Sequence, residues 1–582
     1  MKIVCLVKQV PRADAIEFDQ ETKALRREGV PLLLNPFDAA AVAQAVALKE
    51  RNGGGGEVVA ITMGPPQAEA ALRTCLALGA DRCIHLSDRV FALADTIGTS
   101  RTLALAIQKE GGVDLVLCGR KTTDSETWQV PPEVAAFLRW PHVTSVLETE
   151  VDGDTVRTVR ETDDGRETFE LTGPAVLSLA HARETGDSAD GRIDVWTAHH
   201  LVGEVHEHDR RFGQTGSPTR VLAVRDVTPE RGGDVFGSVE DATPRLQALL
   251  TERRVEPPAW DKPERLGERP GKNYDCWTLV EHVDGRPIRA SLELLGKGRE
   301  LAGKLGGENV ALVLGVDLAA AALQAARHGA ERVVVVEDER LAEYHPELSA
   351  HAVRAVLEQL RPHVLVIPAT TNGRDVGPRV AGELELGMTG DCVGLGIDRA
   401  GRLIQTKPAY GGNIVSVIMG RTTPQLATVR PRMFEPLEPR ELEPKIERFD
   451  PGGWPELRLR STKREPEPAR DLDEADIVVC VGADADGLPA LPDGVALGGT
   501  QGACDRGLLP RSRQIGLLGR QVAPRLLVAI GVRGDFEELT GFVKANVVAA
   551  VGPDRAAPMM SAADVAVIGD WREALPALLR TT

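Results

Sequence analysis

LALGADRC at residues 76–83 and AARHGAERV at residues 325–333 are two copies of one pattern. In each, an Ala/Leu-rich helical stretch ends in Gly-Ala-acid-Arg and leads into an apolar strand. Three further pairs of segments match in the same order, with offsets between 246 and 250 residues: 114–119 with 363–368, 132–135 with 378–381, and 174–179 with 424–429. Ordered matches at a nearly constant offset predict two homologous domains in tandem, at roughly 1–200 and 272–435.

Each repeat alternates short apolar strands with helices. Continuous Val/Ile/Leu strands favour a parallel sheet that is covered on both faces. A hairpin with Asp152-Gly153 at its turn follows in the first repeat, and its counterpart turns near 399–401. In the first repeat we predict strands at 2–7, 57–62, 83–86 and 115–118, and helices at 38–50, 66–78, 95–109 and 132–138.

A third unit, from about 475 to 582, shows a shorter pattern of the same kind, with strands at 477–481, 526–530, 547–551 and 565–568. The predicted fold class is therefore α/β: two tandem homologous doubly wound parallel-sheet domains plus a C-terminal doubly wound nucleotide-binding domain. Two stretches, 252–272 and 431–474, are too charged and Pro-rich for packed regular structure. We predict domains at 1–260 (with a C-terminal arm), 272–435 and 475–582, with a linker at 436–474.

Composition argues against several classes of function. The formal net charge of −17 disfavours nucleic-acid binding. No apolar run approaches the ~20 residues that span a bilayer, and the chain opens directly on a strand, so we predict a cytoplasmic protein. The eight cysteines form no CxxC pair, which predicts buried reduced thiols. The histidines between 199 and 208 lie in a polar loop, where solvation is favoured over metal binding.

Ligands of doubly wound sheets bind at the carboxyl ends of the strands. In the first repeat, segment 119–130 joins a strand to a helix and can hold a phosphate on backbone N–H groups. Ordinary N-capping by Asp and Thr is the alternative. The loops 35–38, 62–65 and 88–96 border the same crevice. The candidate residues are Leu6, Asn35, Met63, Arg89, Asp95, Thr96, Cys118, Gly119, Asp124, Thr127, Trp128, Gln129 and Val130.

The second repeat and the third unit carry further candidate loops. Segments 371–375 and 407–413 come after strands in the second repeat, and the latter is equally explained as a glycine turn. In the third unit, glycines come after strands as in dinucleotide cradles, although no full GxGxxG occurs. The candidates there are Gly499, Thr500, Gln501, Gln514, Gly516, Leu518, Gly519, Gly531, Arg533 and Gly534.

No dedicated catalytic acid, base or nucleophile is visible: the chain has no nucleophile elbow, Walker loop or HExxH. This absence favours a carrier, in which redox chemistry belongs to a bound cofactor.

These motifs resemble the electron-transfer flavoproteins. Residues 1–180 resemble the beta subunit, through MKIVCLVKQVP (1–11) and LVLCGRKTTDSETWQV (115–130). Residues 310–431 resemble the first domain of the alpha subunit, through TNGRDVGPRVAGELELGMTGDC (371–392) and KPAYGGN (407–413). Residues 477–580 resemble the alpha subunit's FAD domain, through GGTQGACDRGLLP (498–510) and QIGLLGR (514–520). The order indicates a beta subunit fused to an alpha subunit, which makes the predicted third domain a flavin-binding one.

The resemblance implies a mobile FAD domain that carries electrons from a flavin-dependent dehydrogenase to a membrane-associated quinone reductase. It implies at least one FAD, and AMP or a second FAD in the first-repeat crevice. SDRVFALADTIGTS (87–100) is similar to the electron-bifurcating members, which typically have Gly where Leu93 stands. A fused chain needs no heterodimer, so a monomer or a homodimer is expected.

The FAD domain departs from the family at positions that contact the flavin. Gln501 replaces an Arg, Leu518 replaces a Thr, and Glu538, a further candidate site residue, replaces a His. Fewer donors to a reduced, anionic flavin should lower its potential and weaken its binding, whereas Arg533 supplies a new positive charge. The segment 190–215, which in the family recognises dehydrogenases, departs as well.

Three functions are compatible with these features. The leading hypothesis is a one-chain FAD electron carrier. The second is a bifurcating, NADH-oxidising flavoprotein with two FADs, and the third is a nucleotide-binding scaffold whose flavin site has decayed.

Overall fold

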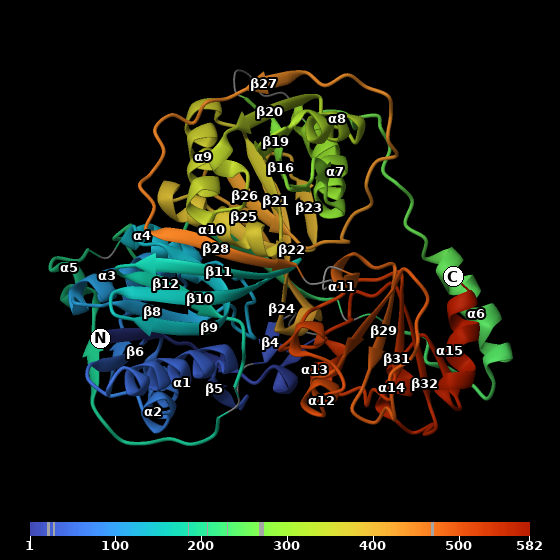
Figure 1. The fold of residues 1–582 in the computed structure, drawn as a ribbon, viewed down its shortest axis with the longest axis horizontal. Coiled ribbons are helices and arrows are strands. Elements are labelled where there is room, and N and C mark those ends of the chain that lie inside the picture. Colours follow the sequence, from blue (N-terminus) through green and yellow to red (C-terminus); the bar gives the residue numbers. More distant parts are fainter. Residues whose placement is uncertain are drawn as a thin grey trace.

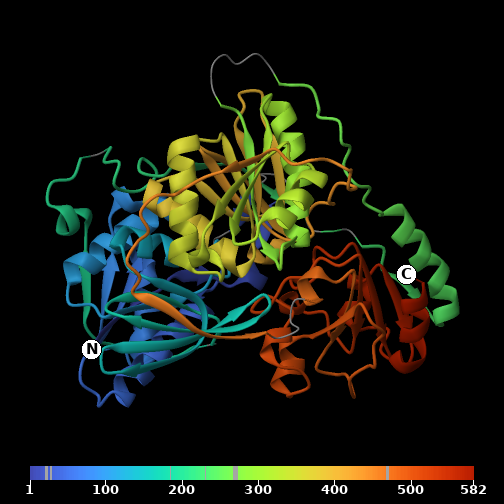
Figure 2. The same ribbon diagram turned by 45° about the horizontal axis from the view of Figure 1, so that its top comes forward.

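The computed structural model describes residues 1–19, 24–26, 29–183, 185–206, 208–227, 229, 231–266, 273–466 and 471–581. Three large sheets, each flanked by helices, form three lobes (Figure 1). In both views the second repeat, green to yellow, lies above the first repeat, blue to teal, and above the C-terminal lobe, red (Figure 2). The predicted α/β fold class is confirmed.

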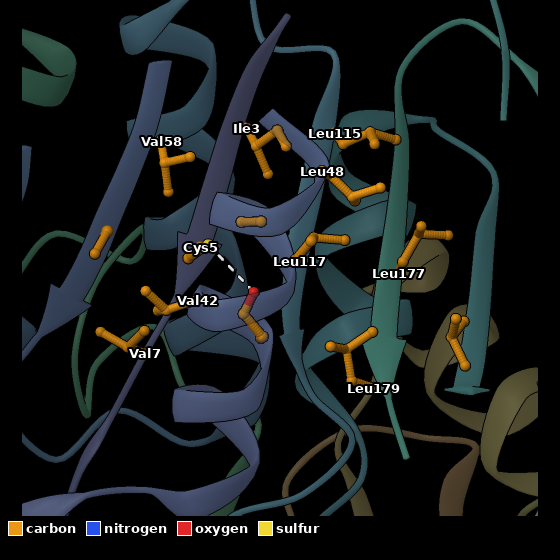
Figure 3. Packing of buried hydrophobic residues seen from close by; sticks show 14 of the residues in the cluster. Ile3, Cys5, Val7, Val42, Leu48, Val58, Leu115, Leu117, Leu177 and Leu179 are labelled. Atoms are coloured by element: carbon orange, nitrogen blue, oxygen red, sulfur yellow. Dashed lines mark hydrogen bonds between the residues drawn. The ribbon is translucent and has the colours of Figure 1, made fainter. Parts of the chain in front are cut away.

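The first sheet is built around β1 (Lys2–Leu6), which pairs in parallel with β6 (Glu57–Met63) and β8 (Leu115–Gly119). Alternate residues of β1 point to opposite faces, so Ile3 and Cys5 pack against α1 and α2 (Figure 3), and the other face packs against α3 and α4. The order is β13-β7-β6-β1-β8-β12-β9-β10-β11-β28. The remaining bounds are α1 Pro36–Arg51, α2 Glu69–Ala77, β7 Arg82–Leu86, α3 Thr96–Glu110, α4 Val130–Leu138, β9 His142–Asp152, β10 Thr155–Thr162, β11 Gly165–Thr172, β12 Ala175–Leu179 and β13 Ile193–Trp196.

The second sheet reproduces this arrangement. Its order, β22-β26-β21-β16-β19-β20-β27, matches β9-β12-β8-β1-β6-β7-β13 of the first sheet strand for strand. Helices α7 and α8 cover one face, and α9 and α10 cover the other. The bounds are β16 Cys276–Val280, α7 Arg289–Leu305, β19 Asn309–Gly315, α8 Ala319–Arg327, β20 Arg332–Glu337, α9 Pro346–Leu360, β21 Val364–Pro368, α10 Thr371–Leu384, β22 Met388–Cys392 and β26 Gln425–Val429.

The third sheet has the order β15-β33-β32-β31-β29-β30. Four of its strands were predicted, and β30 and β15 were not. β15 (Asp234–Phe236) and α6 (Val239–Glu252) come from the predicted C-terminal arm of the first domain, and α6 packs against α15. The other bounds are β29 Ile477–Val481, β30 Val495–Gly499, α12 Gln501–Asp505, β31 Leu526–Ile530, α13 Phe536–Leu539, β32 Val547–Gly552, α14 Pro558–Ala562, β33 Val565–Ile568 and α15 Trp571–Arg580.

The same arm also joins the second repeat. β14 (Thr219–Asp226) pairs antiparallel with β25 (Ile414–Gly420) in a four-stranded sheet completed by β24 (Leu403–Ala409) and β23 (Gly394–Ile397). Residues 219–252 therefore tie the first repeat to both other lobes. The exact domain bounds stay a prediction.

The segment 431–474 was expected to lack packed regular structure, but among its described residues two strands form. β27 (Ile446–Arg448) pairs with β20, and β28 (Leu459–Pro466) pairs antiparallel with β11 over seven residues of that strand. Both are edge strands, which are held by backbone hydrogen bonds and need no continuous apolar face. A short helix, α11 (Asp471–Glu474), then leads into the third sheet.

The two repeats pack through their equivalent helices α4 and α10. Gly382 and Ala136 occupy matching positions of the repeat, and a Cβ on Gly382 would lie 2.8 Å from the Cβ of Ala136. Beside this contact, buried Arg160 of β10 donates from Nη1 to Asp375 Oδ2 at the start of α10, at 2.5 Å. Close packing and a buried ion pair thus join the two repeats.

All eight cysteines are buried and unpaired. Among the residues that the structure describes, no His, Cys, Asp and Glu cluster suits a metal ion. Of the helices in the described part of the chain, none has the length and apolar character needed to cross a membrane.

Candidate functional site

A cavity of about 580 Å³ lies where the three lobes meet. This volume lies within the range of small-molecule sites. The first repeat contributes the loop after β8 and parts of β10 and β11, the second contributes the starts of α7 and α10 and the segment 430–433, and the third contributes Gln501 and segments within 510–544. The loops after β8, β21 and β30 all lie at carboxyl ends of parallel strands, the usual ligand position in doubly wound sheets.

The lining is rich in charge. Ten Arg and Lys residues and eight Asp and Glu residues border the cavity. Most of these cations are compensated: Arg520 bridges to Asp473 at 2.5 Å, and Arg374 bridges to Asp391 at 2.8 Å. Burial raises the pKa of Asp391, but the guanidiniums of Arg374 and Arg430 outweigh this effect and lower its pKa to about 2. Asp391 is therefore an anion at all physiological pH values.

A buried lysine joins the first repeat to the second beneath the cavity. Lys407 Nζ donates to the backbone carbonyl oxygens of Glu126 and Gly390, both at 3.0 Å. Burial lowers the pKa of Lys407 to about 8, and burial likewise lowers the pKa of Lys121 to about 8. Arg430 reaches Glu126 Oε2 at 3.2 Å. The loop of the first repeat is thus held in place by the second.

Gln521 connects this cluster to the third lobe. Its Nε2 donates to Glu126 Oε2 at 3.1 Å, and its Oε1 accepts from Arg430 Nη1. Arg432 reaches the third lobe as well, through Asp476. The FAD-domain-like lobe therefore docks on polar contacts made by both repeats.

Trp128 supplies an aromatic surface on the cavity wall. Its backbone adopts φ +62, an uncommon conformation for a bulky residue. The Arg374 guanidinium lies 4.3 Å from the ring centroid, and that of Arg120 lies 5.1 Å from it. An aromatic ring beside several cations suits a planar ligand that carries phosphates. The first-repeat crevice was predicted to contain Trp128, whereas the structure places it at the junction of the lobes.

Of the remaining candidates of the first-repeat crevice, some lie together near the loop after β8, and others lie in the core or on the surface. Asn35 donates to the backbone oxygen of Lys121, and Asp124 pairs with Lys8 at 2.6 Å. Asp38, from the predicted border loop 35–38, accepts from the N–H of Lys8 and of Gly119, and burial raises its pKa to about 7. Leu6, Met63, Cys118 and Val130 contribute to the core below, Thr127 packs against Gly390, and Arg89 is exposed.

The start of α4 offers a phosphate few donors. Pro131 and Pro132 lack N–H groups, and the Glu133 N–H already binds Gln129 O. The Glu133 side chain accepts from Thr96 and Gln129 and is fully buried, and burial raises its pKa to about 8. Gln129 also bonds across to β22, while Asp95 caps α3 and accepts from Thr219. The hydrogen bonds of Asp95, Thr96 and Gln129 are therefore made to other parts of the protein.

The third group of candidates divides in two. Gln501, Gln514, Leu518 and Gly519 line the cavity. Gly499, Gly531 and Gly534 are required by the protein's own packing, because a Cβ on each would approach another part of the lobe within 2.8 Å. Gly516 adopts φ +145, Thr500 is buried before α12, and Glu538 accepts from the Gly534 N–H at 2.8 Å.

Arg533 does not supply the cavity with a charge. It forms a bidentate pair with Asp484, with both distances 2.9 Å, and lies on the exposed surface. Among the lining cations, Arg120, Arg374 and Arg520 fall within the predicted segments 119–130, 371–375 and 514–520, although none was named there as an individual site residue, whereas Lys544 lies outside these segments. Arg120 directly follows the end of β8, and Arg374 lies in the first turn of α10 after β21, positions typical of ligand-binding residues in doubly wound sheets. Lys544 carries no such signal.

The lining fits a flavin nucleotide in its chemistry. Its cations would offset the negative charge of a pyrophosphate, and Leu518, Val522 and Trp128 provide apolar and aromatic surface for a ring system. If FAD binds here, residues 501–544 and the Trp128 loop are the parts of the chain that would hold it.

Comparison with known proteins agrees with this geometry. The model of the electron transfer flavoprotein domain matches the chain twice, at residues 22–198 and 276–452. The model of the electron transfer flavoprotein FAD-binding domain matches residues 471–543. The two matches of one model correspond to the two repeats.

Individual relatives match one part of the chain each, beta subunits the N-terminal part and alpha subunits the C-terminal part. An electron transfer flavoprotein subunit beta of Thermoanaerobacterium thermosaccharolyticum is 38% identical over 262 residues, 44% of this chain and 100% of that protein. An electron transfer flavoprotein subunit alpha of Clostridium acetobutylicum is 33% identical over 319 residues, 52% of this chain and 95% of that protein. The caffeyl-CoA reductase-Etf complex subunit CarD of Acetobacterium woodii is 37% identical over 268 residues, 44% of this chain and 100% of that protein. The chain belongs to the electron transfer flavoprotein family, with the beta and alpha parts fused in one polypeptide.

Proposed function

We propose that the chain binds FAD in the junction cavity, accepts electrons from a flavin-dependent dehydrogenase and passes them to a quinone reductase or a similar acceptor. The cavity carries this proposal, because the lobe that matches the family's FAD-binding domain and both repeats contribute walls to it. A cofactor held there contacts all three lobes of one chain.

Bound FAD supplies one- and two-electron redox chemistry. The residues of the chain bind it and set its environment: the lining cations offset its negative charge, and Leu518 and Val522 exclude water from one side. Arg120 and Arg374 hold Trp128 in position by stacking on its ring. The absence of a visible catalytic acid or base agrees with a carrier.

For the first-repeat crevice, either AMP or a second FAD was expected. The proline pair at the start of α4 and the buried Glu133 make this helix end a poor phosphate site. We therefore infer one FAD per chain, with no nucleotide phosphate at the start of α4.

The test is the visible spectrum of freshly purified protein, with the released nucleotides quantified per chain. We expect one FAD and no AMP. One FAD with one AMP would keep the carrier function but overturn our inference about the crevice. Protein that holds no flavin and cannot be reconstituted with FAD would refute the proposal in favour of the decayed scaffold. Sedimentation of the same sample distinguishes a monomer from a homodimer.

A bifurcating, NADH-oxidising flavoprotein is the second candidate. It is favoured by the relative whose name places it in a caffeyl-CoA reductase-Etf complex, and by the stretch 87–100. This candidate predicts two FADs per chain and bleaching of the flavin by NADH without oxygen. A spectrum that NADH leaves unchanged, with the partner reductase present, would exclude it.

A further inference from the structure

One cation in the junction cavity differs from its neighbours. Arg289, Arg374, Arg432 and Arg520 each pair with at least one carboxylate. Lys544 also lines the cavity and is half-buried, yet it forms no ion pair and no hydrogen bond with any residue in the described part of the chain. The charged group that acts on it is another cation, Arg430.

This arrangement is unfavourable in the protein by itself. Removing an ammonium from water without a counter-ion costs free energy, and a neighbouring cation adds to the cost. Burial, and after it Arg430, lower the pKa of Lys544. A negatively charged ligand in the cavity would reverse both effects, because it would supply the missing counter-charge.

Among the described third-lobe residues that line the cavity, the other cations are Arg511 and Arg520, and each already pairs with a carboxylate. Gln501 and Leu518 are uncharged, and Arg511, although it lines the cavity, pairs with Asp505 and Gln514. Arg533 is bound to Asp484 outside the cavity. Lys544 is therefore the positive charge on this wall that is left for a ligand.

We propose that Lys544 is the counter-cation for a negative charge of the bound FAD. The inference rests on the proposed function, which places FAD in this cavity. Two parts of FAD carry such a charge: the pyrophosphate, in every redox state, and the ring system, after reduction. Both would be recognised by the same ammonium, and the two differ in what they do to the redox potential.

The experiment compares the wild-type chain with Lys544→Gln, Lys544→Arg and a control, Lys463→Gln, which makes the same chemical change at an exposed lysine of β28. FAD affinity is measured by reconstituting the apoprotein, and the midpoint potential by equilibration with a reference dye. We expect Lys544→Gln to bind at least one redox state of FAD roughly tenfold more weakly, Lys544→Arg to restore most of the loss, and the control to match wild type.

FAD affinity and midpoint potential together show which part of FAD, the pyrophosphate or the reduced ring, carries the charge that Lys544 contacts. A contact with pyrophosphate weakens oxidised and reduced FAD equally and leaves the potential unchanged. A contact with the reduced ring weakens reduced FAD alone; a tenfold loss then lowers the two-electron potential by about 30 mV. Wild-type values of both affinity and potential in Lys544→Gln would overturn the inference.

The wild-type chain distinguishes failure of the proposed function from failure of the role proposed for Lys544. If wild-type protein takes up no FAD, the proposed function fails; if it binds FAD and Lys544→Gln behaves identically, only the role of Lys544 fails. Should Lys544→Gln not fold, the rate of reductive methylation of Lys544 in wild type answers the question. We expect FAD to slow it at least several-fold, and equal rates with and without FAD would contradict the inference.

Discussion

The two repeats have the same strand order and differ in the segments that leave the equivalent strands β8 and β21. After β21 the chain enters α10 within three residues. Thr370 caps this helix, because its hydroxyl oxygen accepts a hydrogen bond from the backbone N–H of Gly373. After β8 it makes a long loop through Trp128 before α4 begins. The shared core fixes the fold, and the inserted loop forms a wall of the cavity. The extra chain that one copy of the duplicated fold carries after β8 therefore lies on the cavity wall.

The equivalent positions of α4 and α10 also differ in charge. Glu133 and Arg379 occupy matching places in the two repeats, and both are buried. Glu133 accepts from hydroxyl and amide groups of its own repeat, whereas Arg379 donates to Trp140 O across the interface at 2.6 Å. One repeat uses the position for an internal network, and the other uses it to bind its partner.

The largest effect is expected from removing the buried ion pair between Arg160 of the first repeat and Asp375 of the second. Asp375→Ala leaves buried Arg160 with Glu167 as its remaining carboxylate and removes an acceptor of Tyr344. Breaking a buried pair of this kind costs about 3 kcal/mol of the free energy of unfolding. Urea denaturation measures it, with exposed Asp152→Ala as the control. A loss below about 1 kcal/mol would show that the pair does not hold the repeats together.

The helix contact can be broken sterically at the position shared by both repeats. Gly382→Val places methyl groups where the Ala136 Cβ and the Glu133 backbone lie, at 2.8 and 3.2 Å from the new Cβ. Overpacking here should cost about 2 kcal/mol. The matched control is Gly396→Val, where a Cβ meets nothing within 4 Å. Equal thermal stability of both variants would mean that α4 and α10 can move apart freely.

The difference in charge between Glu133 and Arg379 can be tested by measuring how stability depends on pH. Burial raises the pKa of Glu133 to about 8, well above the value of about 4.3 in an unfolded chain. The folded state therefore keeps a proton that the unfolded state releases, so the contribution of Glu133 to stability is complete below about pH 4 and is lost as pH rises through about 8.

Glu133→Gln should remove this dependence, which amounts to at most about 1.4 kcal/mol per pH unit. Urea midpoints at several pH values between 5 and 8 measure it, and the exposed Glu150→Gln serves as the control. Parallel pH profiles for wild type and Glu133→Gln would contradict the expectation.

The smallest effect tests the inserted loop. Trp128→Ala removes aromatic surface from the cavity and should weaken FAD binding about three- to tenfold, in line with aromatic contacts worth about 1 kcal/mol. Equilibrium titration of the apoprotein with FAD measures it. Trp454→Ala, which removes a ring stacked with Arg340 and His351 away from the cavity, is the control. Unchanged affinity would show that the loop does not contact the cofactor.

Much of the fold could be predicted because a buried strand is visible in the sequence as a short continuous run of apolar residues. The strands 477–481, 526–530 and 565–568 are found at the predicted residues, since buried parallel strands are continuous apolar runs. The edge strands β27 and β28 were missed, because their polar residues are stabilised by pairing with β20 and β11, which no local pattern reveals.

The site shows the same division. Gln501, Gln514, Leu518 and Gly519 were expected from their position after strands, and they do line the cavity. Arg533 was expected to add charge there, but it pairs with Asp484 instead. The choice between these two partners depends on side-chain geometry within the folded lobe.

By itself, the sequence determined the duplication, the parallel sheets, the FAD-binding lobe and the family, because repeats, apolar runs and motifs are properties of the chain order. Only the tertiary structure decided that the loop after β8, residues 430–433 and Lys544 meet in one cavity, and which cations there are already paired. Charge compensation depends on distances of a few ångströms between side chains such as those of Arg430 and Glu126, which are 304 positions apart, and only the packing of the chain sets those distances.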